Sequence, residues 1–160
     1  HDVGKIVIPD VILNKPGELT EAEIRIVREH AKHASSVLSN IRGTEEIVRV
    51  VRHHHEHYNG RGYPNGLTGD EIPLMARILA VADAFDAMYS ERPYRSALPL
   101  EEIFSRLEQD AGEQFDPGVV KVFVDAVKSG IIDPIERDDE EPQTKETPIS
   151  QAAELQKEAP

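Results

Sequence analysis

The sequence has no cysteine and no tryptophan, and aromatic residues make up only 5% of its 160 residues. The absence of cysteine excludes disulfide frameworks, thiolate zinc sites, iron–sulfur clusters and cysteine nucleophiles. Any bound metal must therefore be held by His, Asp or Glu, and a site without sulfur favours the harder metals. The chain also lacks an apolar run near the roughly 20 residues that span a bilayer, and its start does not resemble a signal peptide. We therefore expect a soluble protein with no membrane span.

Positive charge is scarce, with 18 Lys and Arg against 30 Asp and Glu and a formal net charge of −12. This balance argues against binding to DNA or to an anionic membrane, although a few arginines can still hold a small phosphate ligand. The acidic excess is concentrated at one end, because residues 133–160 contain nine acidic and three basic residues together with four prolines. We expect a folded domain over 1–130 and a disordered acidic tail over 131–160.

Most of the remaining chain has the periodicity of helices. Thr20 and Glu23 have the spacing of a capping box, which predicts a helix from about residue 21. Further helices are predicted from Pro73 onward, over 100–111 and over 116–130. Only residues 5–13, which are apolar and β-branched, are candidates for extended structure. The sequence therefore predicts an all-α helical bundle.

Two of the predicted helices carry polar residues on the face that should pack inward. In the first, one helical face is expected to hold Ile47, Val48, Val51, His54 and His55. In the helix after Pro73, one face is expected to hold Met75, Ala76, Leu79, Ala82, Asp83 and Asp86. Between these helices, residues 57–69 are too rich in Gly, Pro and Asn for regular structure and predict a long loop.

All seven histidines lie within the first 57 residues. A single inward-facing histidine is usually a satisfied core residue, whereas several ionisable groups from separate segments are costly to bury without a metal. The groups expected to face inward come from four segments and are His1, Asp2, His30, His54, His55 and Asp83. Since neutral imidazoles and carboxylates are the usual ligands of iron, manganese and zinc, this set predicts a metal site.

Short motifs in a fixed order make the prediction more specific. They are HDVGK at 1–5, IPD at 8–10, HHE at 54–56, NGRGYP at 59–64, AVADAFDAM at 80–88 and RPYR at 92–95. With these motifs, the sequence over roughly residues 1–129 closely resembles the HD-GYP family of bacterial phosphodiesterases. The resemblance implies an all-α HD-domain helical bundle with a long GYP loop. It also implies cytoplasmic second-messenger signalling, through hydrolysis of cyclic di-GMP to the linear dinucleotide pGpG and commonly on to GMP.

The resemblance further implies the identity of the site residues. The expected ligands of two or three divalent ions, Fe or Mn, are His1, Asp2, His30, His54, His55 and Asp83. Asp2 would bridge two ions, as the reacting centre of a two-metal site requires. Lys5 would direct its ammonium group at the substrate phosphate. Arg92 and Arg95 would hold a phosphate or guanine of the substrate, and Tyr63 would cover or line the pocket.

Two acidic residues are expected to support the metal ligands rather than to bind the metal. Metal-bound imidazoles usually donate their second N–H to an oxygen acceptor, and Glu56 follows directly after the His54–His55 pair. Asp86 lies one helical turn beyond Asp83 and could serve in the same way or contact Lys5. We therefore expect Glu56 and Asp86 to orient metal-binding side chains through hydrogen bonds without binding the metal themselves.

In the family a further ligand histidine comes from a helix upstream of the His–Asp pair, so we expect the sequence to be an N-terminally truncated catalytic domain. Two alternatives remain open at this point. One is a non-catalytic module that binds a cyclic dinucleotide or docks another protein, and the other is an HD phosphohydrolase for a different nucleotide. The expected partners are cyclic di-GMP, a diguanylate cyclase or upstream sensory or receiver domains, and a second copy in a homodimer.

Overall fold

The computed structural model describes residues 1–91 and 96–134, and within these ranges the regular structure is entirely helical. Isolated bridges, Asn59 with Thr68 and Ala111 with Phe115, are the only extended pairings in this part of the chain. The elements in order are η1 (Asp2–Val7), α1 (Asp10–Leu13), α2 (Glu21–Arg28), α3 (His30–Leu38), α4 (Glu45–His53), η2 (Gly69–Glu71), α5 (Leu74–Tyr89), α6 (Leu100–Gln109) and α7 (Pro117–Lys128). The predicted all-α class is therefore confirmed.

Side-chain caps begin two of the predicted helices where the sequence placed them. The Thr20 hydroxyl accepts the N–H of Glu23 at 3.3 Å, and the Glu23 carboxylate accepts the N–H of Thr20 at 2.7 Å. At α7, the carboxylate of Asp116 accepts the N–H of Gly118 at 2.7 Å. Both arrangements satisfy N–H groups that have no partner inside the helix.

Three local expectations are wrong. Residues 5–13 are not extended, because η1 and α1 occupy most of this stretch. His54 is the C-cap of α4, so the histidine pair follows the helix instead of continuing its apolar face. In α5 the buried residues are Ala76, Val81 and Phe85, whereas Met75 and Asp86 are exposed. This helix therefore packs through Ala76 of the predicted face together with Val81 and Phe85, which lie outside that face.

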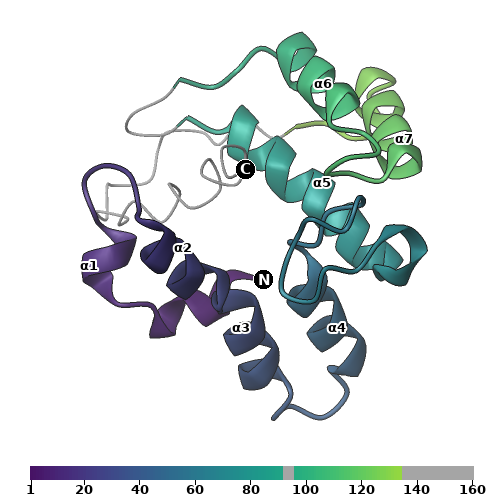
Figure 1. The fold of residues 1–160 in the computed structure, drawn as a ribbon. Helices are drawn as coiled ribbons and strands as arrows, with labels where there is room; N and C mark the ends of the chain where they lie inside the picture. The colour runs from purple at the N-terminus through teal and green to yellow at the C-terminus, as the bar shows by residue number, and fades with distance from the viewer. Residues whose placement is uncertain (92–95, 135–160) are drawn as a thin grey trace.

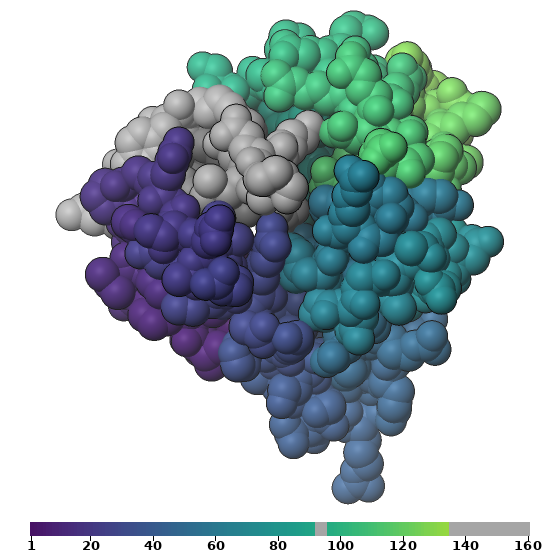
Figure 2. Space-filling view, in the orientation of Figure 1, coloured from purple at the N-terminus to yellow at the C-terminus, as the bar shows by residue number. Residues whose placement is uncertain are grey.

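The helices form two packed groups that α5 joins (Figure 1). In one group α3 packs against η1 and α4. In the other, α5 packs with α6 and α7 around one apolar cluster, whose buried members are Val81, Phe85, Ile103, Phe104, Leu107, Phe115, Val120, Val124 and Val127. The connection between α3 and α4 projects from the body at the bottom of the space-filling view (Figure 2).

The long loop between α4 and α5 is also present as predicted, and it is attached to the second group. The N–H groups of Tyr58 and Asn59 donate to the carbonyls of Gln114 and Glu113, at 3.0 and 2.9 Å. Arg77, near the start of α5, forms ion pairs with Asp70 of the loop at 2.8 Å and with Asp116, the cap of α7, at 2.6 Å. These contacts fix the loop relative to the α6–α7 corner.

No helix among the described residues is both long and apolar enough to cross a membrane. The expected acidic tail lies, from residue 135 on, outside the described residues, as do Arg92 and Arg95.

Gly4 allows η1 to lie directly against the backbone of α3. A Cβ atom at Gly4 would overlap the carbonyl of His30 and the backbone nitrogen of Ala34, neither of which can move without distorting α3. Because Gly4 is two residues from Asp2, this close approach sets the position of the His1–Asp2 pair relative to His30. The missing side chain is thus a requirement of the packing.

Gly4→Ala is expected to destabilise the chain by about 1–3 kcal/mol, because the added methyl group forces η1 away from α3. Urea denaturation measures this loss. The matched change Ile6→Ala, at an exposed position of the same element, is expected to cost less than about 0.5 kcal/mol. Equal effects of the two substitutions would contradict the packing argument.

Candidate metal centre

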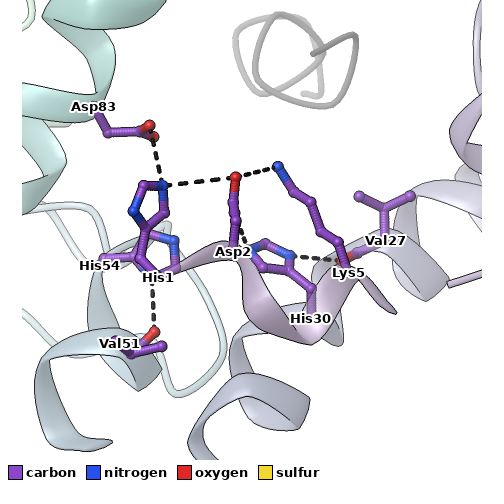
Figure 3. Close-up of polar contacts among 8 residues, drawn as sticks. All are labelled: His1, Asp2, Lys5, Val27, His30, Val51, His54 and Asp83. Atoms are coloured by element: carbon purple, nitrogen blue, oxygen red, sulfur yellow. Dashed lines mark hydrogen bonds and ion pairs between the residues drawn. The ribbon is translucent and has the colours of Figure 1, made fainter. Parts of the chain in front are cut away.

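Four segments that lie far apart in the sequence bring their histidines and carboxylates to one place (Figure 3). Nitrogen atoms of His30, His54 and His55 lie within 4.8 Å of one another, and so do ligand atoms of His1, Asp2 and His54. Asp83 joins from α5, with its Oδ1 atom 3.4 Å from Nε2 of His1. The structure therefore brings together all six residues for which metal binding was predicted.

The two oxygens of Asp2 face different histidines. Oδ1 lies 3.7 Å from Nε2 of His30, and Oδ2 lies 3.6 Å from Nε2 of His1. Both distances exceed those of ordinary hydrogen bonds. They are close to the roughly 3.0–3.4 Å that separates two ligand atoms on one ion when each bond is about 2.1 Å long. This spacing suits a carboxylate that serves one ion through each oxygen.

Two of the imidazole rings are held in one orientation by backbone carbonyls. Nδ1 of His30 lies 2.8 Å from the carbonyl of Val27, and Nδ1 of His54 lies 2.6 Å from the carbonyl of Val51. Since a carbonyl only accepts, each Nδ1 carries the proton and donates, and each Nε2 presents a lone pair to the centre. Backbone carbonyls commonly support metal-bound histidines in this way.

The same two Nε2 atoms are buried without a hydrogen-bond partner. Both residues are only 1% exposed, so bulk water does not serve as the acceptor or donor. A buried polar atom with no partner costs on the order of 1–3 kcal/mol. Two such atoms, aimed at the same place beside a carboxylate, fit a bound cation, which accepts both lone pairs.

The electrostatic environment keeps the inner imidazoles neutral, which is the form that binds metals. Burial lowers the pKa of His54 to about 4 and lowers the pKa of His30 and, by a larger amount, of His55. His1 differs, because its contact with the Asp83 carboxylate raises its pKa despite partial burial. Near neutral pH the three inner rings are therefore available as ligands.

Lys5 lies on the Asp2 side of the centre, with its ammonium 2.7 Å from Oδ2. Partial burial by itself would raise the pKa of Asp2, but the charge and hydrogen bond of Lys5 outweigh it and lower the pKa. The 3-10 turn of η1 makes this contact, since residues three apart share a face. Asp2 is thus a carboxylate at neutral pH, and the ammonium lies at the edge of the centre where we expected it to reach a phosphate.

The long loop folds back onto the histidine pair. The N–H of Tyr63 donates to the carbonyl of His55 at 3.1 Å, and the two rings stack with centroids 4.9 Å apart and planes inclined by 26°. Gly62 permits this contact, because a Cβ there would overlap the backbone of Glu56 and His57. Tyr63 therefore lies against a candidate ligand.

Glu56 contacts the loop, which the sequence did not predict. Its buried carboxylate accepts the N–H groups of Asn65, Gly66 and Leu67 at 2.8, 2.9 and 3.1 Å and lies 3.3 Å from Nδ1 of His53. None of these four contacts of Glu56 is with His54 or His55. Glu56 holds the loop that carries Tyr63, and so it supports the centre by a route different from the one expected.

For Asp86 the structure shows a contact with a residue outside the candidate ligands. Asp86 is exposed and accepts the hydroxyl of Ser90 at 3.2 Å, near the end of α5. The supporting carbonyls of Val27 and Val51 were not foreseen, since a backbone acceptor leaves no residue-type signal. Val27 and Val51 each lie three residues before the histidine that they contact. Every histidine in a helix has a backbone carbonyl at this position, so the spacing does not mark a metal site.

Comparison with known proteins adds relatives of one kind. The HD domain family model matches residues 1–119. The chain is 43% identical over 117 residues to 3'3'-cGAMP-specific phosphodiesterase 3 of Vibrio cholerae, covering 73% of this chain and 25% of that protein. It is 45% identical over 128 residues to the cyclic di-GMP phosphodiesterase of Thermotoga maritima, covering 78% of this chain and 34% of that protein.

The fold is similar to the crystal structure of a cyclic GMP-AMP-specific phosphodiesterase of V. cholerae. The TM-score is 0.55 at 24% sequence identity, over 78% of this chain and 33% of the other. The likeness shows that the two share a fold. The chain spans only a quarter to a third of the length of the relatives that it matches.

Burial of His54 predicts a loss of stability in acid for the metal-free chain. Its pKa falls from 6.5 to about 4 on folding, so between these pH values the unfolded state binds more protons and acid favours it. The loss attributable to this group is on the order of 3 kcal/mol, complete near pH 4. Urea denaturation across this range should show a shallower loss for His54→Gln. The exposed His33→Gln should retain the wild-type slope, and an unchanged slope in His54→Gln would refute the assignment.

Replacing Glu56 by Gln is expected to loosen the loop, because an amide accepts N–H groups less strongly than a carboxylate does. Hydrogen exchange of the amides of residues 65–67 should accelerate by about 10- to 100-fold, corresponding to roughly 1–3 kcal/mol of lost local stability. Glu101→Gln, at an exposed site on α6, serves as the control. Unaltered exchange at 65–67 in the Glu56 variant would show that the carboxylate does not hold the loop.

Proposed function

This chain belongs to the HD domain family, in its HD-GYP branch, and we propose that it supplies the catalytic centre of a metal-dependent phosphodiesterase for cyclic dinucleotides. The observation that carries the proposal is the pair of buried, partnerless Nε2 atoms of His30 and His54, aimed at the carboxylate of Asp2. A purely structural cluster would be expected to satisfy these atoms internally.

The residues suited to hold the metal are the predicted six: His1, Asp2, His30, His54, His55 and Asp83. We propose two ions as the minimum, since each oxygen of Asp2 faces a different histidine. Iron or manganese is favoured by a donor set of imidazole and carboxylate without sulfur. When bound, such ions neutralise charge on a phosphodiester and supply a nucleophile at neutral pH.

The protein's own groups have separate tasks in this proposal. The carbonyls of Val27 and Val51 fix the direction of the two imidazoles, so that no reorientation is needed when the metal binds. The Lys5 ammonium offsets part of the negative charge of a bound phosphate and keeps Asp2 ionised. Arg92 and Arg95, outside the described residues, are proposed to bind the phosphate or guanine of the substrate, as the family resemblance implies.

The names of the relatives support a cyclic dinucleotide as the substrate class. Proteins named for cyclic di-GMP and for 3'3'-cGAMP match this chain at 45% and 43% identity, so a cyclic dinucleotide is common to both. We propose cyclic di-GMP as the substrate and 3'3'-cGAMP as the second candidate. A cytoplasmic role in bacterial signalling, with regulatory domains, a diguanylate cyclase or a second copy as partners, belongs to the same proposal.

Anaerobic hydrolysis assays with the Fe²⁺- or Mn²⁺-loaded chain test the function. Cyclic di-GMP and 3'3'-cGAMP are supplied separately, and the linear products are quantified. Asp2→Asn keeps the shape of the side chain but removes its charge, and it should lower turnover at least about 100-fold. The matched Asp10→Asn, at an exposed site on α1, should turn over like the wild type. Hydrolysis at the same rate by the wild type and by Asp2→Asn would contradict the proposal.

A further inference from the structure

Arg28 forms the outer end of a row of stacked groups that leads to the candidate centre. Its guanidinium carbon lies over the ring of Tyr63, 5.2 Å from the centroid. The Tyr63 ring stacks on the ring of His55. The rings of His55 and His30 meet edge to face, with their centroids 4.9 Å apart. Arg28 is the last residue of α2, so this row connects α2 with the loop and with the segment that follows α4.

The guanidinium is placed in a costly position. Its Nε atom is buried and has no hydrogen-bond partner in the structure. The attraction between the guanidinium and the electron-rich face of the Tyr63 ring offsets part of the cost of burying this atom. Arg28 also contributes, after burial, to lowering the pKa of His57. An arginine held here for solubility or for a surface ion pair would not need to bury this atom.

The three inner histidines are oriented by different means. The rings of His30 and His54 are anchored by the carbonyls three residues earlier. The ring of His55 has the Tyr63 ring stacked on one of its faces. Tyr63 in turn is held by the backbone hydrogen bond to His55, by the loop anchored at Glu56 and by the guanidinium of Arg28. A change at Arg28 therefore reaches His55 through one aromatic ring.

We infer that Arg28 is a positioning residue, which fixes the ring of Tyr63 and through it the metal-binding orientation of His55. The inference rests on the proposed function, because it requires His55 to bind a metal. The two possible roles of Arg28 predict opposite changes in metal affinity when its charge is removed. If Arg28 acted only as a nearby positive charge, its removal would strengthen the binding of a cation. If it positions Tyr63, its removal weakens that binding.

Manganese titrations of the full 160-residue chain test this inference, with free Mn²⁺ followed by electron paramagnetic resonance. Arg28→Gln is expected to weaken Mn²⁺ binding by about tenfold, the lower end of the effect of residues that support metal ligands. Arg28→Lys retains a cation for the Tyr63 ring and should recover most of the affinity. The control Arg25→Gln removes the same charge from a largely exposed site on α2 and should bind like the wild type.

A double-substitution cycle shows whether the effect passes through Tyr63. Tyr63→Leu should weaken Mn²⁺ binding, and adding Arg28→Gln to it should produce little further loss. Circular dichroism and the thermal midpoint verify folding. If Arg28→Gln does not fold, Arg28→Met, which retains the apolar stem, takes its place.

Each result bears on a different claim. Unchanged or tighter Mn²⁺ binding by Arg28→Gln, or fully additive losses with Tyr63→Leu, would overturn the positioning role and leave the proposed function intact. A folded wild-type chain that binds no Mn²⁺ would overturn the metal centre, and with it both proposals.

Discussion

The arrangement depends on the cost of burying imidazole nitrogens that have no partner within the protein. His30 and His54 each donate one ring N–H to a backbone carbonyl, and the other ring nitrogen of each is buried without a hydrogen-bond partner. Their low exposure holds both rings neutral near pH 7, and Lys5 keeps the neighbouring Asp2 ionised. A shared cation would satisfy both neutral nitrogens and the neighbouring carboxylate at once. The metal-free chain therefore holds this unfavourable arrangement through the packing around it.

That packing comes from features outside the centre. Gly4 lets the segment that carries His1 and Asp2 lie against α3, and Gly62 lets the long loop lie against the histidine pair. Glu56 holds the same loop through three backbone N–H groups, and Tyr63 covers His55. The apolar cluster of α5, α6 and α7 supplies a rigid base on which Asp83 is mounted. Two glycines and one buried carboxylate thus help to set the geometry of the candidate ligands.

The sequence predicted the helical class, the capping box at Thr20, the helix that begins near residue 116, the long loop and the group of candidate ligands, because each has a local signature or a motif. It misplaced features that depend on tertiary packing. The stretch 5–13 looks extended by composition, yet the contact with α3 favours compact turns. His54 and His55 continue the apolar spacing of α4, but the helix ends at His53. The roles of Glu56 and of the Val27 and Val51 carbonyls follow from where the backbone runs, and residue identity alone does not encode them.

In the proposed centre, His30, His54 and Asp2 converge to hold a cation. Anomalous diffraction from crystals of the Mn²⁺-loaded chain tests this arrangement most directly, because the signal locates the metal without reference to activity. We expect a peak within coordination distance of Nε2 of His30 or His54 and an oxygen of Asp2, with a second peak about 3.5–4 Å away, as in two-metal hydrolases. Loaded crystals that show metal only at other sites, with both Nε2 atoms still without a partner, would contradict it.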